Sequence, residues 1–141
     1  MASPSRPEIP SSFRFEFDSA NKILLGRVEG RLTDDSLAEI YSEIRKYAIA
    51  TDASAGIWDM SSVTEFAMSA KFVRSLASQE PAMPEATYPI IVAGMNPTGF
   101  GFARMFQIVG EDTRPLLQVV HTLDEALTIL GVQSPHFEPL E

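Results

Sequence analysis

Residues 88–94 read Tyr88-Pro-Ile-Ile-Val-Ala-Gly94, and this stretch is apolar along almost its whole length. A strand that faces solvent on one side alternates apolar and polar side chains, whereas a strand covered on both faces need not. The stretch therefore predicts a strand that is covered on both faces. That arrangement is typical of the α/β class, in which helices join parallel strands and lie on the faces of the sheet.

Strand signals continue on both sides of this stretch. Three phenylalanines alternate with charged residues over 13–18, which predicts a half-buried strand. A short turn leads to a second strand over 23–31, and the shortness of that turn indicates an antiparallel hairpin. A third strand is predicted over 55–60, followed by a polar loop, and a fifth over 116–121.

Apolar residues at helical spacing predict four helices between these strands. Residues that can cap a helix stand at several of the predicted starts, including Thr33, Ser69 and the capping box Thr122-Leu-Asp-Glu125. The resulting order is ββαβαβαβα. It predicts an α/β fold with a mixed, largely parallel five-stranded sheet and four helices.

The same pattern predicts one domain with two short extensions. We expect the domain over 12–132, because the strand and helix signals all fall within it. The proline-rich residues 1–11 indicate a disordered lead-in, and residues 133–141 a loose tail.

Composition limits the sites that this chain can hold. Its 141 residues include no cysteine, which excludes disulfides, Cys-based zinc sites and cysteine nucleophiles. Eleven Lys and Arg stand against nineteen Asp and Glu, for a net charge of −8, so we expect no nucleic-acid partner. No segment has the length of a membrane span, and the first residues lack the apolar core of a signal peptide. We expect a cytoplasmic protein.

Catalytic and metal sites are not indicated. The two histidines, His121 and His136, have no neighbouring motif that would activate a serine or hold a metal. We therefore expect no enzyme activity, no metal and no cofactor. Asp59, Ser61 and Ser62 follow the third strand, where α/β sheets place ligands. Such residues also cap turns, and both interpretations stay open.

A glycine-rich loop over 94–104 is the strongest candidate for ligand binding. Gly99 and Gly101 resemble the start of the dinucleotide motif G-x-G-x-x-G, but Arg104 occupies the position of its third glycine. The loop is therefore interpreted either as a turn or as a site for a small anion, held by helix N–H groups and Arg104. Trp58 and Phe100 are the expected apolar contacts of that ligand.

One longer segment carries a family resemblance. The element order, together with Ile57-Trp-Asp-Met-Ser-Ser-Val-Thr-Glu-Phe-Ala-Met-Ser69, resembles the STAS domain family, the fold of bacterial anti-sigma factor antagonists. The resemblance covers most of 12–132. In such antagonists a strand ending in Asp-hydrophobic-Ser-x-Val leads to a helix whose N-terminal serine is phosphorylated by a partner kinase. Asp59, Ser61 and Val63 match that pattern.

The resemblance places Ser69 at the position of the phosphorylated serine. The family's loop usually reads Asp-Ser-Ser-Gly, whereas this chain has Ala67-Met-Ser-Ala70. The later stretch Gly101-Phe-Ala-Arg-Met-Phe-Gln107 is similar to uncharacterised bacterial STAS-like proteins.

Two functions are predicted from these observations. The first is a non-enzymatic regulatory module that binds a protein partner and is switched by phosphorylation at Ser69, with Ser69 as a plain helix cap the alternative at that position. The second is a small-ligand binding domain that uses the loops 59–66 and 94–104 to hold an anion. An uncovered sheet edge also invites pairing, which predicts a homodimer.

Overall fold

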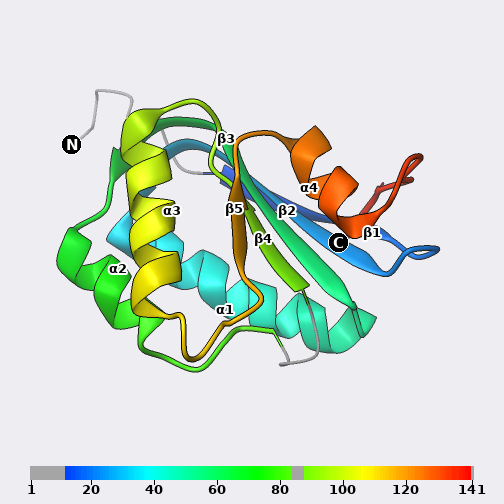
Figure 1. Cartoon of the computed structure of the whole chain (residues 1–141), viewed down its shortest axis with the longest axis horizontal. Coiled ribbons are helices and arrows are strands. Elements are labelled where there is room, and N and C mark those ends of the chain that lie inside the picture. The colour runs from blue at the N-terminus through cyan, green and yellow to red at the C-terminus, as the bar shows by residue number, and fades with distance from the viewer. Residues whose placement is uncertain (1–11, 84–87, 141) are drawn as a thin grey trace, which may run out of the picture.

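The structure, a computed structural model that describes residues 12–83 and 88–140, is built on one six-stranded sheet (Figure 1). Its strands are β1 Ser12–Asp18, β2 Ile23–Thr33, β3 Ala55–Ala67, β4 Tyr88–Val92, β5 Gln118–Val120 and β6 Glu138–Pro139. They lie side by side in the order β5-β4-β3-β2-β1-β6. The predicted lead-in over 1–11 lies outside the described residues.

The pairing of these strands confirms a mixed, largely parallel sheet. β2, β3, β4 and β5 are parallel neighbours, while β1 is antiparallel to both β2 and β6. The predicted hairpin is therefore present, and Ile90, Ile91 and Val92 of the opening sequence stretch are all buried. β4 lies between β3 and β5, with apolar clusters on both of its faces.

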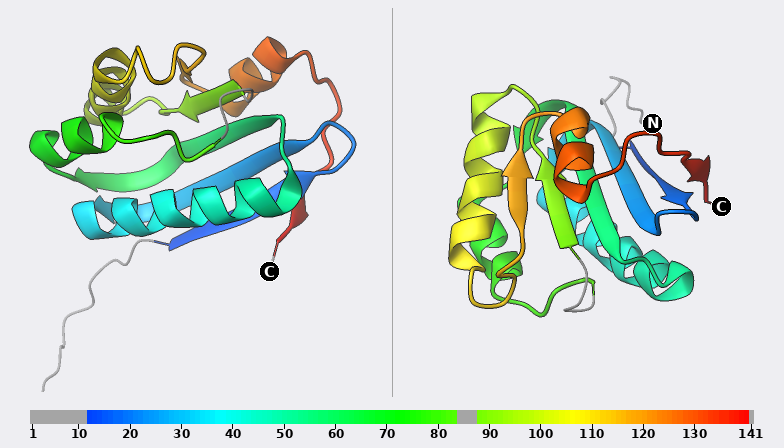
Figure 2. Two further views of the ribbon diagram at one scale, coloured as in Figure 1. Left: turned by 90° about the horizontal axis from the view of Figure 1, so that it is seen from below. Right: turned by 45° about the vertical axis from the view of Figure 1, so that its right-hand side comes forward.

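Four helices cover the two faces of the sheet unequally. They are α1 Asp34–Thr51, α2 Ala70–Ala77, α3 Pro97–Val109 and α4 Leu123–Leu130. The left-hand view of Figure 2 shows α1 on one side of the sheet and α4 on the other. α1 packs on the cluster around Leu24 and Val28, and α3 packs on Ile91 of the same face. α4 alone covers the opposite face, through Ala126.

Two predicted helix starts are confirmed by their capping geometry. Thr33 accepts a hydrogen bond from the Ser36 N–H and closes a capping box with that residue. Thr122 and Glu125 form the predicted capping box of α4, and Gly131 ends that helix in the left-handed conformation, at φ 73°. None of the helices in the described part of the chain is long and apolar enough to cross a bilayer.

The predicted loop after the third strand is wrong, because β3 continues as far as Ala67. Its second half pairs with the end of β2, in a register that joins Thr33 to Ala67. The register shifts twice along this stretch, between Arg27 and Glu29 and again after Gly30. The shifts insert extra residues into β3, as β-bulges do, and so break the alternation that sequence reading relies on.

The helix after β4 also begins earlier than predicted. Asn96 caps α3 by accepting hydrogen bonds from the N–H groups of Thr98 and Gly99, and Pro97 occupies the first helical position. Proline is well suited to that position because its missing N–H would be unpaired there anyway. The predicted loop over 96–101 is therefore wrong, since the chain is helical from Pro97 onward.

The chain end adds a sixth strand that the sequence did not predict. β6 lies in the segment predicted to be a loose tail, and the Leu140 N–H donates to the Phe15 carbonyl at 2.8 Å. Asp18 holds the segment that leads into β6 by accepting a hydrogen bond from the His136 N–H. The carboxylate of Asp18 also accepts from the N–H groups of Ala20 and Asn21 and from the Asn21 side chain.

These contacts set the ionisation of Asp18. Its burial acts to raise the pKa, but the hydrogen bonds from Asn21, His136 and Ala20 favour the charged form and leave the pKa below its ordinary value of 3.8. A carboxyl group whose pKa is lowered on folding stabilises the folded chain above its unfolded pKa. That stabilisation is lost as the pH falls through the folded value.

We predict that Asp18→Asn lowers the free energy of unfolding by about 2 kcal/mol at pH 7, because an amide removes the charge and leaves donors without an acceptor. The difference between wild type and variant should shrink as the pH falls below about 4, because the carboxyl group is protonated there first in the unfolded chain and, at lower pH, in the folded chain. Urea unfolding at several pH values measures it. A difference independent of pH would contradict the assigned role of the charge.

Candidate functional site

Ser69 stands exposed at the start of α2, where its hydroxyl group makes two hydrogen bonds. It accepts from the Phe72 N–H at 3.0 Å, which caps the helix, and lies 3.0 Å from Asp34 Oδ2, to which it donates. The Ser69 N–H donates to Asp34 Oδ1 at 2.9 Å. One carboxylate therefore holds both the backbone and the side chain of Ser69. We call this pair of residues the Ser69–Asp34 clasp.

Topology brings the two residues of the clasp together. Asp34 is the first residue of α1, which follows β2, and Ser69 precedes α2, which follows β3. Because β2 and β3 are parallel and end side by side, the two helix starts lie at the same edge of the sheet. A carboxylate there is stabilised by the positive ends of the helix dipoles. Sequence reading missed Asp34 as a site residue, although the parallel order of the strands was a signal for it.

The exposed face of α2 carries positive charge. Lys71 and Arg74 are exposed and, among the described residues, form no ion pair with a carboxylate. The chain as a whole has a net charge of −8. The exposed face of α2 therefore carries two positive charges that are unpaired among the described residues, in a chain whose net charge is negative.

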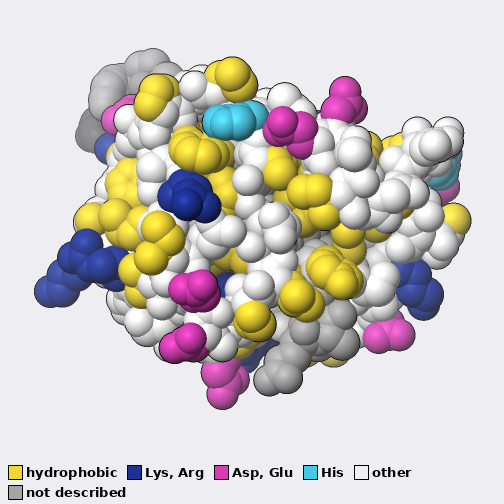
Figure 3. All heavy atoms as spheres, viewed as in Figure 1, with side chains coloured by type: hydrophobic (Ala, Val, Ile, Leu, Met, Phe, Trp, Pro, Cys, Tyr) yellow, Lys and Arg dark blue, Asp and Glu magenta, His cyan; other side chains and the backbone are white. Residues whose placement is uncertain are grey.

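Apolar side chains gather on the neighbouring helix. α2 and α3 pack against each other, and Figure 3 shows a group of apolar side chains over α3. Met95, Ile108, Val109 and Leu116, on α3 and beside it, are between 39% and 78% exposed. Large exposed apolar groups of this kind are common at protein-binding surfaces.

Asp59, Ser61 and Ser62 all lie within β3, near its first bulge. The buried carboxylate of Asp59 accepts from the Ser61 N–H at 3.0 Å and from the Ser61 hydroxyl group at 2.6 Å. Its other oxygen lies 3.6 Å from Arg27 Nη1 on β2. Asp59 thus satisfies backbone and side-chain donors where the register shifts, while Ser61 and Ser62 are exposed.

The residues predicted to bind an anion do not converge on one point. Arg104 is exposed and donates to the Gln107 side chain, and Gly101 is exposed on the same helix. Phe100 stacks on His121 with ring centroids 4.6 Å apart. Trp58 lies on the sheet face beneath α1 and α3. The structure does not bring these residues together, and anion binding by them stays a prediction.

Close packing fills the space between the two stretches that were expected to form that site. A Cβ atom on Gly99 would lie 2.4 Å from the Phe66 ring, and one on Gly94 would lie 3.0 Å from Ser61 Cα. Gly94 also has a positive φ of 76°, which glycine adopts without strain. Because Gly94 and Gly99 have no side chain, the start of α3 and the residues that precede it can pack directly on β3.

Solved structures share this fold. An anti-sigma factor antagonist from Mycobacterium paratuberculosis is 20% identical, with a TM-score of 0.56, over 86% of this chain and 95% of that one. An uncharacterised protein of the DUF3478 family with a SpoIIAA-like fold, from Shewanella loihica PV-4, is 14% identical, with a TM-score of 0.56, over 91% and 99%.

By sequence alone, no protein-family model and no curated protein matches the chain. The structural likeness confirms the predicted STAS-like fold. Identities at this level establish the fold, and function has to be argued from the residues of the site.

We predict that Gly99→Ala lowers the free energy of unfolding by about 1 kcal/mol, because the added methyl group would collide with the Phe66 ring. Gly101→Ala is the matched control. Its methyl group meets nothing within 4 Å, so the variant should gain about 0.5–1 kcal/mol from helix propensity. Urea unfolding of both variants measures the contrast, and equal stabilisation of both would contradict the close packing of α3 on β3.

We predict that Ser69→Ala lowers the free energy of unfolding by about 1 kcal/mol, because α2 loses its cap and Asp34 loses a donor. Ser62→Ala, at an exposed serine of β3, should change it by less than about 0.5 kcal/mol. Thermal or urea unfolding compares the two. A Ser69 variant as stable as the Ser62 control would show that the clasp contributes nothing to stability.

Proposed function

We propose that this chain is a non-enzymatic regulatory module that binds a protein partner through the surface around Ser69, and that phosphorylation of Ser69 switches this binding. The observation that carries the proposal is the exposed Ser69 hydroxyl group, held by Asp34 at the start of α2. The fold shared with an anti-sigma factor antagonist supports the same class of function.

A phosphate group on Ser69 would change both the contacts and the charge of this surface. Esterification removes the proton that the hydroxyl group donates to Asp34, and adds a charge of about −1.5 to −2 beside that carboxylate. Repulsion would then open the clasp. The helix N-terminus and the nearby Lys71 would favour the phosphate, so the modified residue would stay at the start of α2 in a new arrangement.

The same modification would largely cancel the positive charge of the binding surface. In the unmodified chain Lys71 and Arg74 make the exposed face of α2 positive, which suits a partner with an acidic surface. A phosphate at the first turn would repel such a partner. The apolar side chains on and beside α3 extend the surface with groups that a partner could bury.

The proposal is tested with the full chain, tagged and used to capture proteins from cells of its source. Ser69→Asp imitates the phosphate charge, Ser134→Asp adds the same charge at an exposed serine far along the chain, and Lys71→Glu/Arg74→Glu reverses the charge of α2. We expect a partner that is retained by wild type and by Ser134→Asp, and is reduced at least tenfold by the other two variants.

A second measurement covers the modification itself. Mass spectrometry of the chain isolated from those cells should find phosphate on the peptide that contains Ser69. A protein that binds wild type and Ser69→Asp equally would refute the switch. Capture of no protein that is sensitive to Lys71→Glu/Arg74→Glu would refute the binding surface.

A further inference from the structure

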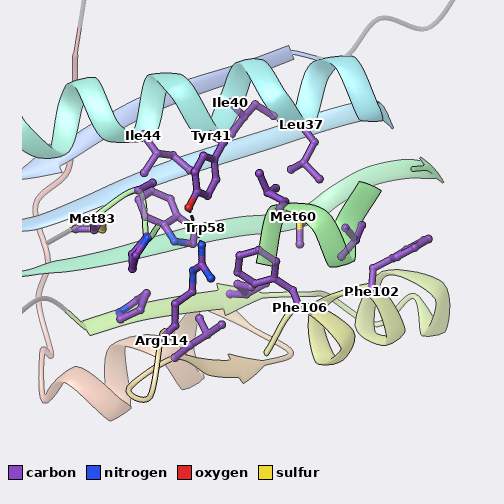
Figure 4. Close-up of a pocket in the computed structure, with 18 of the residues that line it drawn as sticks. Leu37, Ile40, Tyr41, Ile44, Trp58, Met60, Met83, Phe102, Phe106 and Arg114 are labelled. Atoms are coloured by element: carbon purple, nitrogen blue, oxygen red, sulfur yellow. Dashed lines mark hydrogen bonds between the residues drawn. The ribbon is translucent and has the colours of Figure 1, made fainter. Parts of the chain in front are cut away.

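A cavity of about 350 Å³ lies between the sheet and the three helices α1, α2 and α3 (Figure 4). Its walls are mostly apolar, with large side chains contributed by separate elements. They include Leu37 and Ile40 from α1, Trp58 and Met60 from β3, and Phe102 and Phe106 from α3. Protein interiors are normally packed with few voids larger than a water molecule, so a space of this size in an apolar core indicates a binding site.

Two charged residues line this mostly apolar cavity: Asp112, which is exposed, and Arg114, which is buried. Arg114 lines the cavity and is 7% exposed. Its Nη1 donates to the Ala77 carbonyl at 2.7 Å, and its Nη2 donates to the Tyr41 hydroxyl group at 2.6 Å and to the Gln79 carbonyl at 3.2 Å. The guanidinium group also lies over the Phe106 ring, 4.6 Å from its centroid.

Among the described residues, Arg114 has no carboxylate within ion-pair distance, although the exposed Asp112 lines the same cavity. All its acceptors are uncharged. Removing a charge from water is costly, and buried arginines are for that reason usually paired with an acidic group. An anion inside the cavity would supply the missing charge.

The guanidinium group also has hydrogen-bonding capacity left for such an anion. Its Nε–H makes no hydrogen bond to a described residue. No fully buried side-chain nitrogen or oxygen atom among the described residues lacks a partner, so the unpaired Arg114 Nε is at least partly accessible. Tyr41 is held next to it, since its hydroxyl group donates to the Glu80 carbonyl and accepts from Arg114.

We propose that the cavity binds an amphipathic carboxylate, with the carboxylate on Arg114 and an apolar chain along the wall formed by Trp58, Met60 and Phe106. An apolar cavity of about 150 Å³ holds benzene, so 350 Å³ accommodates roughly ten to fourteen non-hydrogen atoms. A medium-chain fatty acid such as decanoate falls in this range. Its charged group is Arg114 and not Arg104 of the anion site predicted at the 94–104 loop, although Trp58 belongs to both, and the inference does not rest on the role of Ser69.

Trp58 provides a direct readout, because it is the only tryptophan of the chain and lines the cavity. The purified full chain is titrated with decanoate and with decan-1-ol, below the concentrations at which either aggregates, while Trp58 emission is followed. We expect a saturable change with decanoate, and binding of the uncharged alcohol at least about tenfold weaker, because the charge-assisted hydrogen bonds to Arg114 are lost.

Two variants separate the cavity from the charge. Ala103→Leu fills the cavity from α3 while leaving Arg114 in place, and should abolish the response to both ligands. Arg114→Gln removes the charge, and should weaken decanoate about tenfold or more while leaving the alcohol nearly unchanged. Circular dichroism checks that each variant is folded. If Arg114→Gln does not fold, the proposal is tested by comparing decanoate with decan-1-ol in wild type and in Ala103→Leu.

Three results would overturn the proposal. Absence of a saturable response to decanoate would exclude this ligand class. A response that persists in Ala103→Leu would place binding outside the cavity. Equal affinity for decanoate and decan-1-ol would mean that Arg114 serves only to hold the carbonyl groups at the end of α2.

Discussion

The parallel pairing of β2 with β3 is the constraint on which the other features of this chain depend. It runs from Ile23 beside Ala55 to Thr33 beside Ala67, well beyond the point where β4 ends. Because the two strands are parallel and end together, the helices that follow them start next to each other. The contact of Asp34 with Ser69 is a direct result, although the two residues are 35 positions apart in the sequence.

The extension of β3 also determines how α3 is placed. Beyond Asp59 the strand no longer pairs with β4, and the segment that follows β4 packs on it instead. Gly94 and Gly99 allow this approach because neither has a side chain to collide with Ser61 or Phe66. A feature that resembles part of a phosphate-binding loop in sequence is thus explained by packing between a helix and a strand.

Unequal covering of the sheet explains both the cavity and the charged surface opposite to it. Three helices stand over one face, and the cavity remains where their large side chains do not meet. The other face has only the short α4, so the parts of β1 and β2 beyond its reach carry paired charges, among them Arg14 with Glu29 and Arg27 with Glu16. The cavity and the Ser69–Asp34 clasp share the connection between β3 and α2, since Met68 lines the cavity and precedes Ser69.

Local patterns in the sequence determined the element types, their order and several of their ends. Alternation identified β1, apolar continuity identified β4, and capping residues such as Thr33, Ser69 and Thr122 identified helix starts, because each signal depends on neighbours within a few residues. The tertiary structure decided what depends on distant partners. β3 extends to Ala67 because β2 lies beside it, and β6 forms because β1 offers an edge. Asp34 reaches Ser69, and Arg114 reaches the cavity, because chain segments far apart in sequence meet there, and no local pattern records such a meeting.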